Sequence, residues 1–170
     1  MKLGLMDMRD TLVQQMKWCY DTPGWFANLS DALDDLTFED AVKSSSEDPH
    51  TIWDTLNHLI YWNDRNLQKF KDPSITLPKV IQDNEQTFKQ KELEKTEENW
   101  ISTIEKAHQV FSHWISVVEE ATEERLNSHL SDSDDRIASE VIAHIIIHNA
   151  YHIGQIVLIR KLHGIWENKY

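Results

Sequence analysis

Four stretches of the chain place apolar residues three or four positions apart, which is the spacing of an amphipathic helix. The first covers about residues 5–20 and stops at the turn-forming run Thr22-Pro23-Gly24. The segment that follows, residues 25–48, predicts one short helix and then a loop.

The second stretch has a recognisable start and end. Asp48 is a suitable N-cap and Pro49 fits the first helical position, while Asp72-Pro73 ends the helix. Between them runs a stripe of apolar residues: Ile52, Leu56, Leu59, Ile60, Leu67 and Phe70.

The third and fourth stretches complete an all-helical pattern. After a proline-containing link, the third helix is predicted from about Phe88 to about residue 121. The fourth is predicted to be capped by Asp132 or Ser133 and to run to about His163, with Gly164 as its stop. Four long helices with short connections predict an all-α fold, a four-helix bundle.

Length and charge narrow the setting in which the protein works. The 170 residues fit a single domain over residues 1–170, and 17 basic against 29 acidic residues give a net charge of −12. An acidic chain without a basic segment argues against nucleic acid and against an anionic membrane as partners. No apolar run approaches the roughly 20 residues of a membrane span, and the one cysteine, Cys19, cannot form an internal disulfide. We therefore expect a cytoplasmic location.

The histidines are the most informative polar residues. Three of the nine, His144, His148 and His152, follow one another at four-residue intervals in the fourth helix, on the same face as Val141 and Ile145. Imidazoles on an apolar face are costly to bury unless they find partners.

A histidine pair at i and i+4 can chelate one ion, and a histidine from a facing helix can complete the set. On the second helix, His58 lies at the edge of the apolar stripe, so that His58, His148 and His152 would form a three-nitrogen site with a position left open. A core histidine that is merely hydrogen-bonded remains the alternative for each residue. His144 lies about 12 Å along the helix from His152, which suits a supporting or packing role. His50, His108, His113, His129 and His163 are assigned to caps, surface or packing.

Three motifs resemble those of the DinB-like superfamily of metal-binding four-helix bundles. They are HNAYHIGQI at residues 148–156, HTIWDTLNHLIYWNDR at residues 50–65 and WFANLSDALDDLT at residues 25–37. Together they cover most of the chain in the right order. Many relatives have two adjacent histidines in the first motif; here Tyr151 replaces the first of them and His152 is kept.

The resemblance implies an up-down-down-up bundle, often a homodimer, that holds a divalent ion on His58, His148 and His152. Zinc, nickel, iron and copper all suit three imidazoles. Known relatives include thiol-dependent transferases that use bacillithiol, mycothiol or glutathione, and a maleylpyruvate isomerase. The implied function is a metal-dependent thiol transferase, or a hydrolase-like enzyme, acting on small electrophilic substrates. A non-enzymatic metal-binding bundle of the stress response is the alternative.

Several other residues have two possible roles. Asp54 could orient His58 or cap its helix, and we favour the cap; Gln155 could support the ligands or only pack. Cys19 is expected to be a buried structural thiol, since no basic residues cluster near it. The seven tryptophans are expected to fill the core and a dimer interface, and one or two could wall a substrate pocket.

Overall fold

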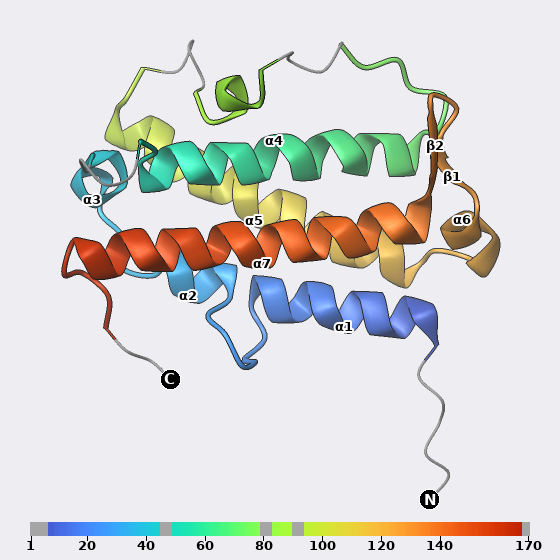
Figure 1. Ribbon diagram of the computed structural model, residues 1–170, viewed down its shortest axis with the longest axis horizontal. Helices are drawn as coiled ribbons and strands as arrows, with labels where there is room; N and C mark the ends of the chain where they lie inside the picture. The colour runs from blue at the N-terminus through green and yellow to red at the C-terminus, as the bar shows by residue number, and fades with distance from the viewer. Residues whose placement is uncertain (1–6, 45–48, 79–82, 90–93, 168–170) are drawn as a thin grey trace, which may run out of the picture.

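The structure is a computed structural model that describes residues 7–44, 49–78, 83–89 and 94–167. Within these ranges four helices exceed ten residues: α1 (Met8–Tyr20), α4 (Ile52–Lys71), α5 (Glu97–Glu119) and α7 (Ala138–Leu162). They lie side by side as a bundle (Figure 1). The predicted all-α four-helix bundle is confirmed.

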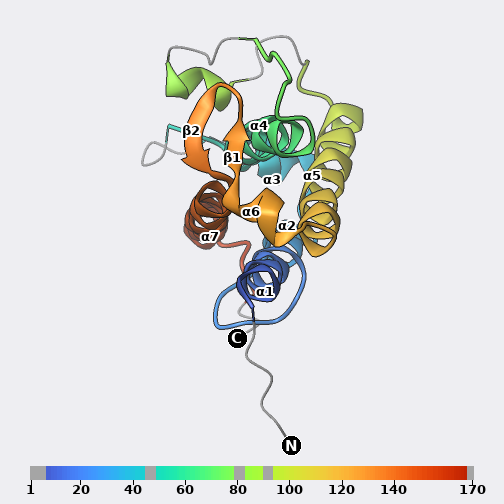
Figure 2. The same ribbon diagram turned by 90° about the vertical axis from the view of Figure 1, so that its right-hand side faces the viewer.

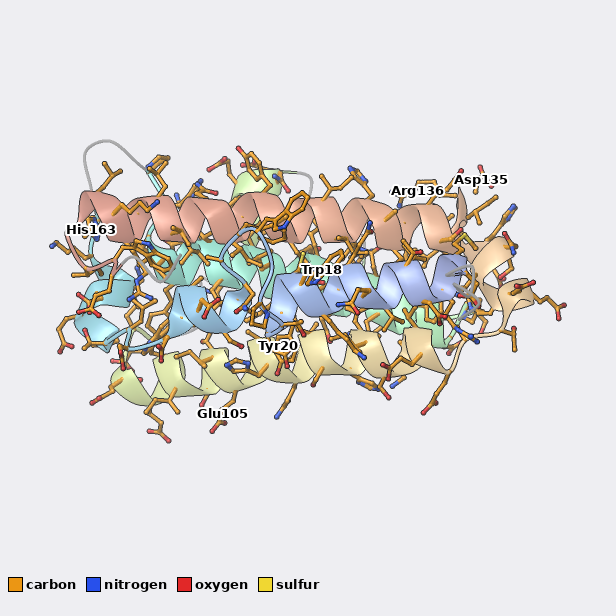
Figure 3. The ribbon with its side chains drawn as sticks, turned by 90° about the horizontal axis from the view of Figure 1, so that it is seen from below. Trp18, Tyr20, Glu105, Asp135, Arg136 and His163 are labelled. Atoms are coloured by element: carbon orange, nitrogen blue, oxygen red, sulfur yellow. The ribbon has the colours of Figure 1, made fainter. Side chains whose placement is uncertain are left out.

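The helix directions follow the up-down-down-up order. In Figure 1, α4 and α5 run one way along the bundle, and α1 and α7 run the opposite way. Seen from its end, the bundle has α1 and α4 at opposite corners, each packed against both α5 and α7 (Figure 2). From below, α1 lies between α5 and α7 and in front of α4 (Figure 3). The neighbours α4 and α7, which carry the candidate ligands, are therefore antiparallel.

The start of α4 differs from the prediction. Its N-cap is Thr51, whose hydroxyl accepts from the backbone N–H of Asp54, while the carboxylate of Asp54 accepts from the backbone N–H of Thr51. Pro49 precedes the helix in a bend, and Asp48 lies outside the described residues. A capping box satisfies two backbone donors at once, which favours this start over a single aspartate cap.

The segment before α5 is not a continuous helix. A short 3-10 helix, η1 (Asn84–Thr87), ends at Phe88, and α5 begins only at Glu97 behind the cap Thr96. The predicted start near Phe88 is therefore wrong where the structure describes the chain. The described residues of this connection, Lys89, Glu94, Lys95 and Thr96, are all polar and offer no apolar face that would hold a helix against the bundle.

The connection before α7 is also different from the prediction. Asp132 and Ser133 do not cap α7; they form the turn of an antiparallel hairpin of β1 (His129–Ser131) and β2 (Asp134–Ile137). The helix begins directly after β2, where the Glu140 carboxylate accepts from the backbone N–H of Ile137. The predicted end is close, because α7 stops at Leu162 and Gly164 adopts φ 72°.

Short helices fill the remaining connections. Residues 25–44 contain two rather than one, α2 (Leu29–Leu33) and α3 (Phe38–Val42), each with its own capping box. The helix α6 (Glu123–Asn127) leads into the hairpin. From α6, Arg125 donates to the carbonyl of Phe70 at the end of α4 and to that of Leu130 in β1, and so joins α4 to the hairpin.

The helix α7 is the most apolar of the four long helices, and it contacts α1, α2, α4, α6 and both strands of the hairpin. By length and composition alone it could cross a membrane, but half of the relevant window is buried inside the bundle. The core helix of a helical bundle meets the same criterion, so this feature is weak evidence for a membrane span. At its end, the buried Arg160 donates to the carbonyls of Ala32 and Asp34 at the end of α2, where a cation is favourable.

One pair of amides fixes how α4 and α7 are aligned. The buried Asn63 of α4 and Asn149 of α7 donate to each other's side-chain oxygens, at 2.7 and 3.1 Å. The Asn63 side chain also donates to the backbone carbonyl of Leu59. The backbone carbonyl of Asn63 accepts from the indole N–H of Trp114 on α5. Buried amides stabilise a fold only when they are paired, so this pair favours one register of α4 along α7.

Asn63→Ala is expected to lower the free energy of unfolding by about 1–3 kcal/mol, because the Asn149 amide would stay buried and lose its partner. The change in the free energy of unfolding is measured by urea denaturation monitored with circular dichroism. Asn127→Ala is the matched control, since Asn127 also donates to the carbonyl four residues earlier but is exposed. Equal losses in the two variants would show that the buried pair has no special role.

Candidate metal centre

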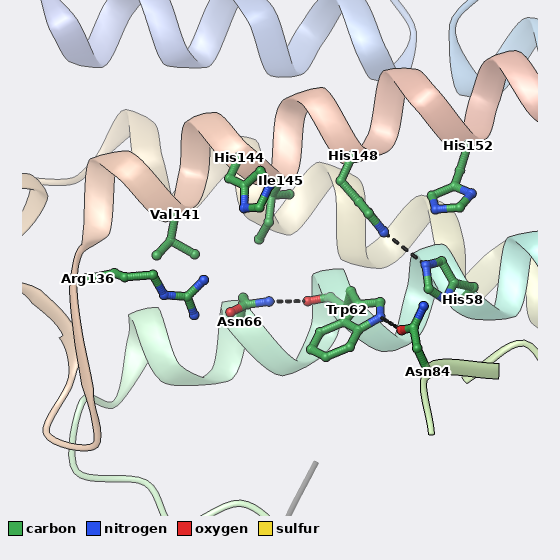
Figure 4. Close-up of a pocket in the computed structure, with 10 residues that line it drawn as sticks. All are labelled: His58, Trp62, Asn66, Asn84, Arg136, Val141, His144, Ile145, His148 and His152. Carbon is green, nitrogen blue, oxygen red and sulfur yellow. Dashed lines mark hydrogen bonds between the residues drawn. The ribbon is translucent and has the colours of Figure 1, made fainter. Parts of the chain in front are cut away.

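The three predicted histidines lie together between α4 and α7. His58, in the middle of α4, is 2% exposed, and His148 and His152 project toward it from successive turns of α7 (Figure 4). The ring centroids are 5.0 Å apart for His58 and His148 and 4.5 Å apart for the other two pairs. One nitrogen from each ring lies within 4.8 Å of the other two, so the cluster could hold a metal ion.

A hydrogen bond to a threonine sets the tautomer of His58. The Thr87 hydroxyl donates to the Asn84 carbonyl at 2.6 Å, so its oxygen accepts from His58 Nδ1, which lies 2.5 Å away. With the proton on Nδ1, the Nε2 lone pair of His58 points into the cluster. A partner that holds the second ring nitrogen is the usual companion of a metal-ligating histidine.

Gln155 has the same relation to His152. The side-chain oxygen of Gln155 lies 2.9 Å from His152 Nδ1 and accepts a hydrogen bond from it, which leaves the lone pair of His152 on Nε2. The prediction that Gln155 supports the cluster is therefore favoured over simple packing. A glutamine three residues after a histidine on one helix face is a signal that the sequence itself contains.

The spacing of the nitrogens fits one ion. His58 Nε2 and His148 Nε2 are 3.0 Å apart; with the His58 proton on Nδ1, this contact is a hydrogen bond in which His148 Nε2–H donates to the His58 Nε2 lone pair. Nitrogens bound tetrahedrally at about 2.0–2.1 Å lie roughly 3.3 Å from each other. A movement of a few tenths of an ångström converts the observed pair into two ligands.

Burial keeps these imidazoles neutral. It lowers the pKa of His58 to about 3 and that of His148 to about 4, and the neighbouring imidazoles add to the effect. Burial also lowers the pKa of His152, against the opposing hydrogen bond to Gln155. Neutral imidazole is the form that binds metal, so His58 and His152 can bind an ion through Nε2 at pH 7, and His148 can do so once its proton has moved from Nε2 to Nδ1.

A phenylalanine covers the outer face of the cluster. The Phe88 ring stacks on His58 with centroids 3.9 Å apart, and its other face stacks on His50 at 4.0 Å. His50 thus has the packing role that was predicted for it. Thr87, at the end of η1, and Phe88, directly after it, both contact His58, and the sequence analysis did not identify either of them. Their contacts with α4 span about thirty residues of sequence and leave no local pattern.

The cluster opens into a pocket of about 350 Å³, which is within the size range of small-molecule sites. Its lining is mostly apolar and neutral: His58, Trp62, Asn66, Asn84, Arg136, Val141, His144, Ile145, His148 and His152. Trp62 forms one wall, and its indole donates to Asn84 Oδ1 at 3.3 Å (Figure 4). The three rings at the end of this pocket are therefore reachable by a small molecule.

The other candidate residues have simpler roles. Asp54 belongs to the capping box of α4, as favoured. His144 is exposed and lines the pocket one turn before His148. Cys19 is 1% exposed, and burial raises the pKa of its thiol to about 11, which makes it unreactive at neutral pH.

The tryptophans divide between core and surface. Trp53, Trp100 and Trp114 are buried as expected, and Trp62 walls the pocket. Trp25 is fully exposed.

A protein-family model described as the DinB superfamily matches residues 25–156, which is more than half of the chain and contains all three motifs. The chain belongs to the DinB superfamily. No curated protein and no solved structure gives a significant match. The protein is therefore a DinB-superfamily helical bundle with a three-histidine cluster that could bind a metal ion.

In the metal-free protein at pH 7, nitrogen NMR is expected to show a neutral His58 with its proton on Nδ1. Thr87→Val removes the hydroxyl that accepts from His58 Nδ1, and should change the free-energy difference between the two His58 tautomers by about 0.5–1.5 kcal/mol in favour of the other one. Thr103→Val is the control, because Thr103 is also buried and accepts from a ring N–H, that of Trp53. Unchanged His58 signals in the Thr87 variant would contradict the assignment.

Proposed function

We propose that the protein is a divalent-metal-dependent transferase that directs a low-molecular-weight thiol onto small electrophiles. The observation that carries the proposal is the convergence of three histidine nitrogens at the wall of an open pocket. Structural zinc sites are closed by four protein ligands, whereas catalytic sites leave a position to water or substrate. No fourth His, Cys, Asp or Glu joins this cluster among the described residues.

His58, His148 and His152 would hold the ion, and three neutral imidazoles suit zinc, nickel, iron or copper. Such an ion keeps its full charge and lowers the pKa of a bound thiol or water. Thr87 and Gln155 keep two of the rings oriented, and Phe88 shields His58 from water. These residues prepare the site without taking part in proton transfer.

The lining of the pocket favours a thiol over water as the nucleophile. Among the described lining residues there is no carboxylate, lysine, tyrosine or cysteine that could serve as a general base or acid. A hydrolase needs such groups to move protons to and from water and the leaving group. A thiol that ionises beside a metal ion needs no further base. Among the described lining residues, His144 is the one imidazole outside the cluster that could move a proton.

The same observation supports a second candidate, a metal-binding bundle without enzymatic activity. A pocket whose described lining offers no acid–base side chain outside the cluster other than His144 is also what a purely structural or sensing role would leave. This alternative uses the same three ligands and has no need for a thiol. Homodimer formation, a small-molecule substrate and a cytoplasmic location stay predictions.

His148→Ala is expected to abolish stoichiometric metal binding, because two remaining imidazoles hold an ion far more weakly than three. The measurement is the metal content after dialysis against micromolar zinc, with about one ion per chain expected in the unmodified protein. His129→Ala is the control, since His129 is exposed on β1. Equal metal content in both variants would remove the proposed site.

Cobalt-loaded protein is expected to develop a sulfur-to-metal charge-transfer band when a low-molecular-weight thiol is added. The visible spectrum follows the band, and His148→Ala should not show it. A protein that binds cobalt but gives an unchanged spectrum with every thiol tested would favour the non-enzymatic alternative.

A further inference from the structure

The pocket beside the histidines differs in charge from the rest of the molecule. The chain has a net charge of −12, yet none of the described residues that line the pocket is acidic. Among the described residues that line the pocket, Arg136 is the one arginine or lysine. A positive group in a pocket without carboxylates is available to an anion.

Arg136 is held in place at the end of the pocket opposite His58 and His152. It comes from β2, and its guanidinium points past Val141 into the pocket (Figure 4). Its Nε and Nη2 donate to the two oxygens of Asp134, at 2.9 and 2.8 Å. An arginine fixed in this way is oriented before any ligand arrives.

The ion cluster around Arg136 keeps an excess of positive charge. Lys69 Nζ lies 3.2 Å from Asp134 Oδ2, so that two cations share one carboxylate. The hydrogen bonds from Arg136, with that from Lys69, hold the pKa of Asp134 well below its usual range. Asp134 therefore stays ionised and neutralises only one of the two cations.

The guanidinium has donors left for a second anion. A guanidinium carries five N–H groups, and Asp134 occupies the edge formed by Nε and Nη2. The Nη1 edge, which Asp134 does not use, remains for a second carboxylate. Arginine recognises carboxylates through paired N–H groups of this kind.

The distance across the pocket sets the length of the ligand. His58 and Asn66 line opposite parts of it and are eight residues apart on α4, which is about 12 Å along the helix. Trp62, Val141 and Ile145 form apolar walls between the two ends. A ligand that fills this space has an apolar middle of several carbon atoms.

We propose that the pocket takes a small molecule with a carboxylate that pairs with Arg136 while the other end of the molecule reaches the three histidines. This inference rests on the proposed function, because the histidine end is the metal centre. It adds the substrate class: an anionic, elongated molecule. Arg136 is the residue that selects it.

Three thiols of equal length test the charge requirement on cobalt-loaded protein: 6-mercaptohexanoate, 6-mercaptohexanol and 6-mercaptohexylamine. The charge-transfer band gives the affinity of each. We expect the carboxylate to bind about tenfold more tightly than the alcohol, and the amine to bind most weakly. Equal affinities for all three would overturn the inference and leave the proposed function standing.

Variants of Arg136 assign the preference to this residue. In Arg136→Gln the carboxylate and the alcohol are expected to bind equally, while Arg136→Lys keeps a cation for Asp134 and should retain part of the preference. Arg9→Gln is the matched control, since Arg9 also pairs with an aspartate two residues away, Asp7, but lies on α1. A preference that persists in Arg136→Gln would place the anion site elsewhere.

A measurement without metal keeps the inference testable if the metal centre fails. In metal-free protein, millimolar hexanoate should shift the side-chain nitrogen signal of Arg136, and hexanol should not. If cobalt or thiols do not bind but this shift occurs, the proposed function fails and the anion site remains. If the signal does not move and the thiols show no charge preference, the anion site is absent.

Discussion

The contact between α4 and α7 is the constraint on which the rest of the molecule depends. Polar groups buried in a helical bundle are tolerated only when each finds a partner. Here Asn63 and Asn149 pair in the core. The contact between His58 and His148 lies within two helical turns of this amide pair. Sliding α7 along α4 by one turn would separate both pairs. The alignment that satisfies the amides is therefore the alignment that assembles the histidines.

Burial has a second consequence, which is chemical. A low-dielectric environment disfavours charged imidazole, so the three rings that converge on one point stay neutral, which is the protonation state that binds metal. The hydrogen bonds from Nδ1 of His58 and His152 decide which nitrogen faces that point. Arg136 places a positive charge at the far end of the adjacent pocket, on a side chain that is more than half exposed to solvent. The neutral histidines and the cationic end of the pocket are the two features on which the proposed anionic ligand depends.

Much of this could be predicted from local patterns. The spacing of apolar residues located the four long helices, and the four-residue interval of His148 and His152 placed them on one face. Predictions were wrong where they relied on weak local signals. Asp132 and Ser133 looked like helix caps, but the same residue types form turns, and pairing of the flanking strands decided between the two. Phe88 looked like the start of a helix, but it lies at the end of η1, and its ring stacks between two histidines.

The sequence by itself determined the four long helices, the shared face of His148 and His152 and the inert character of Cys19, because each depends on spacing or composition within a short segment. His58 was assigned to the set as a residue of a facing helix and by the family resemblance. The tertiary structure alone decided which groups surround them. Thr87 reaches His58 from a connection almost thirty residues away, and Arg136 reaches the pocket from a hairpin that local propensity did not indicate. Contacts of this kind arise when separate elements pack, since the free energy that selects them comes from burial and pairing across the bundle and not from the neighbours of each residue in the chain.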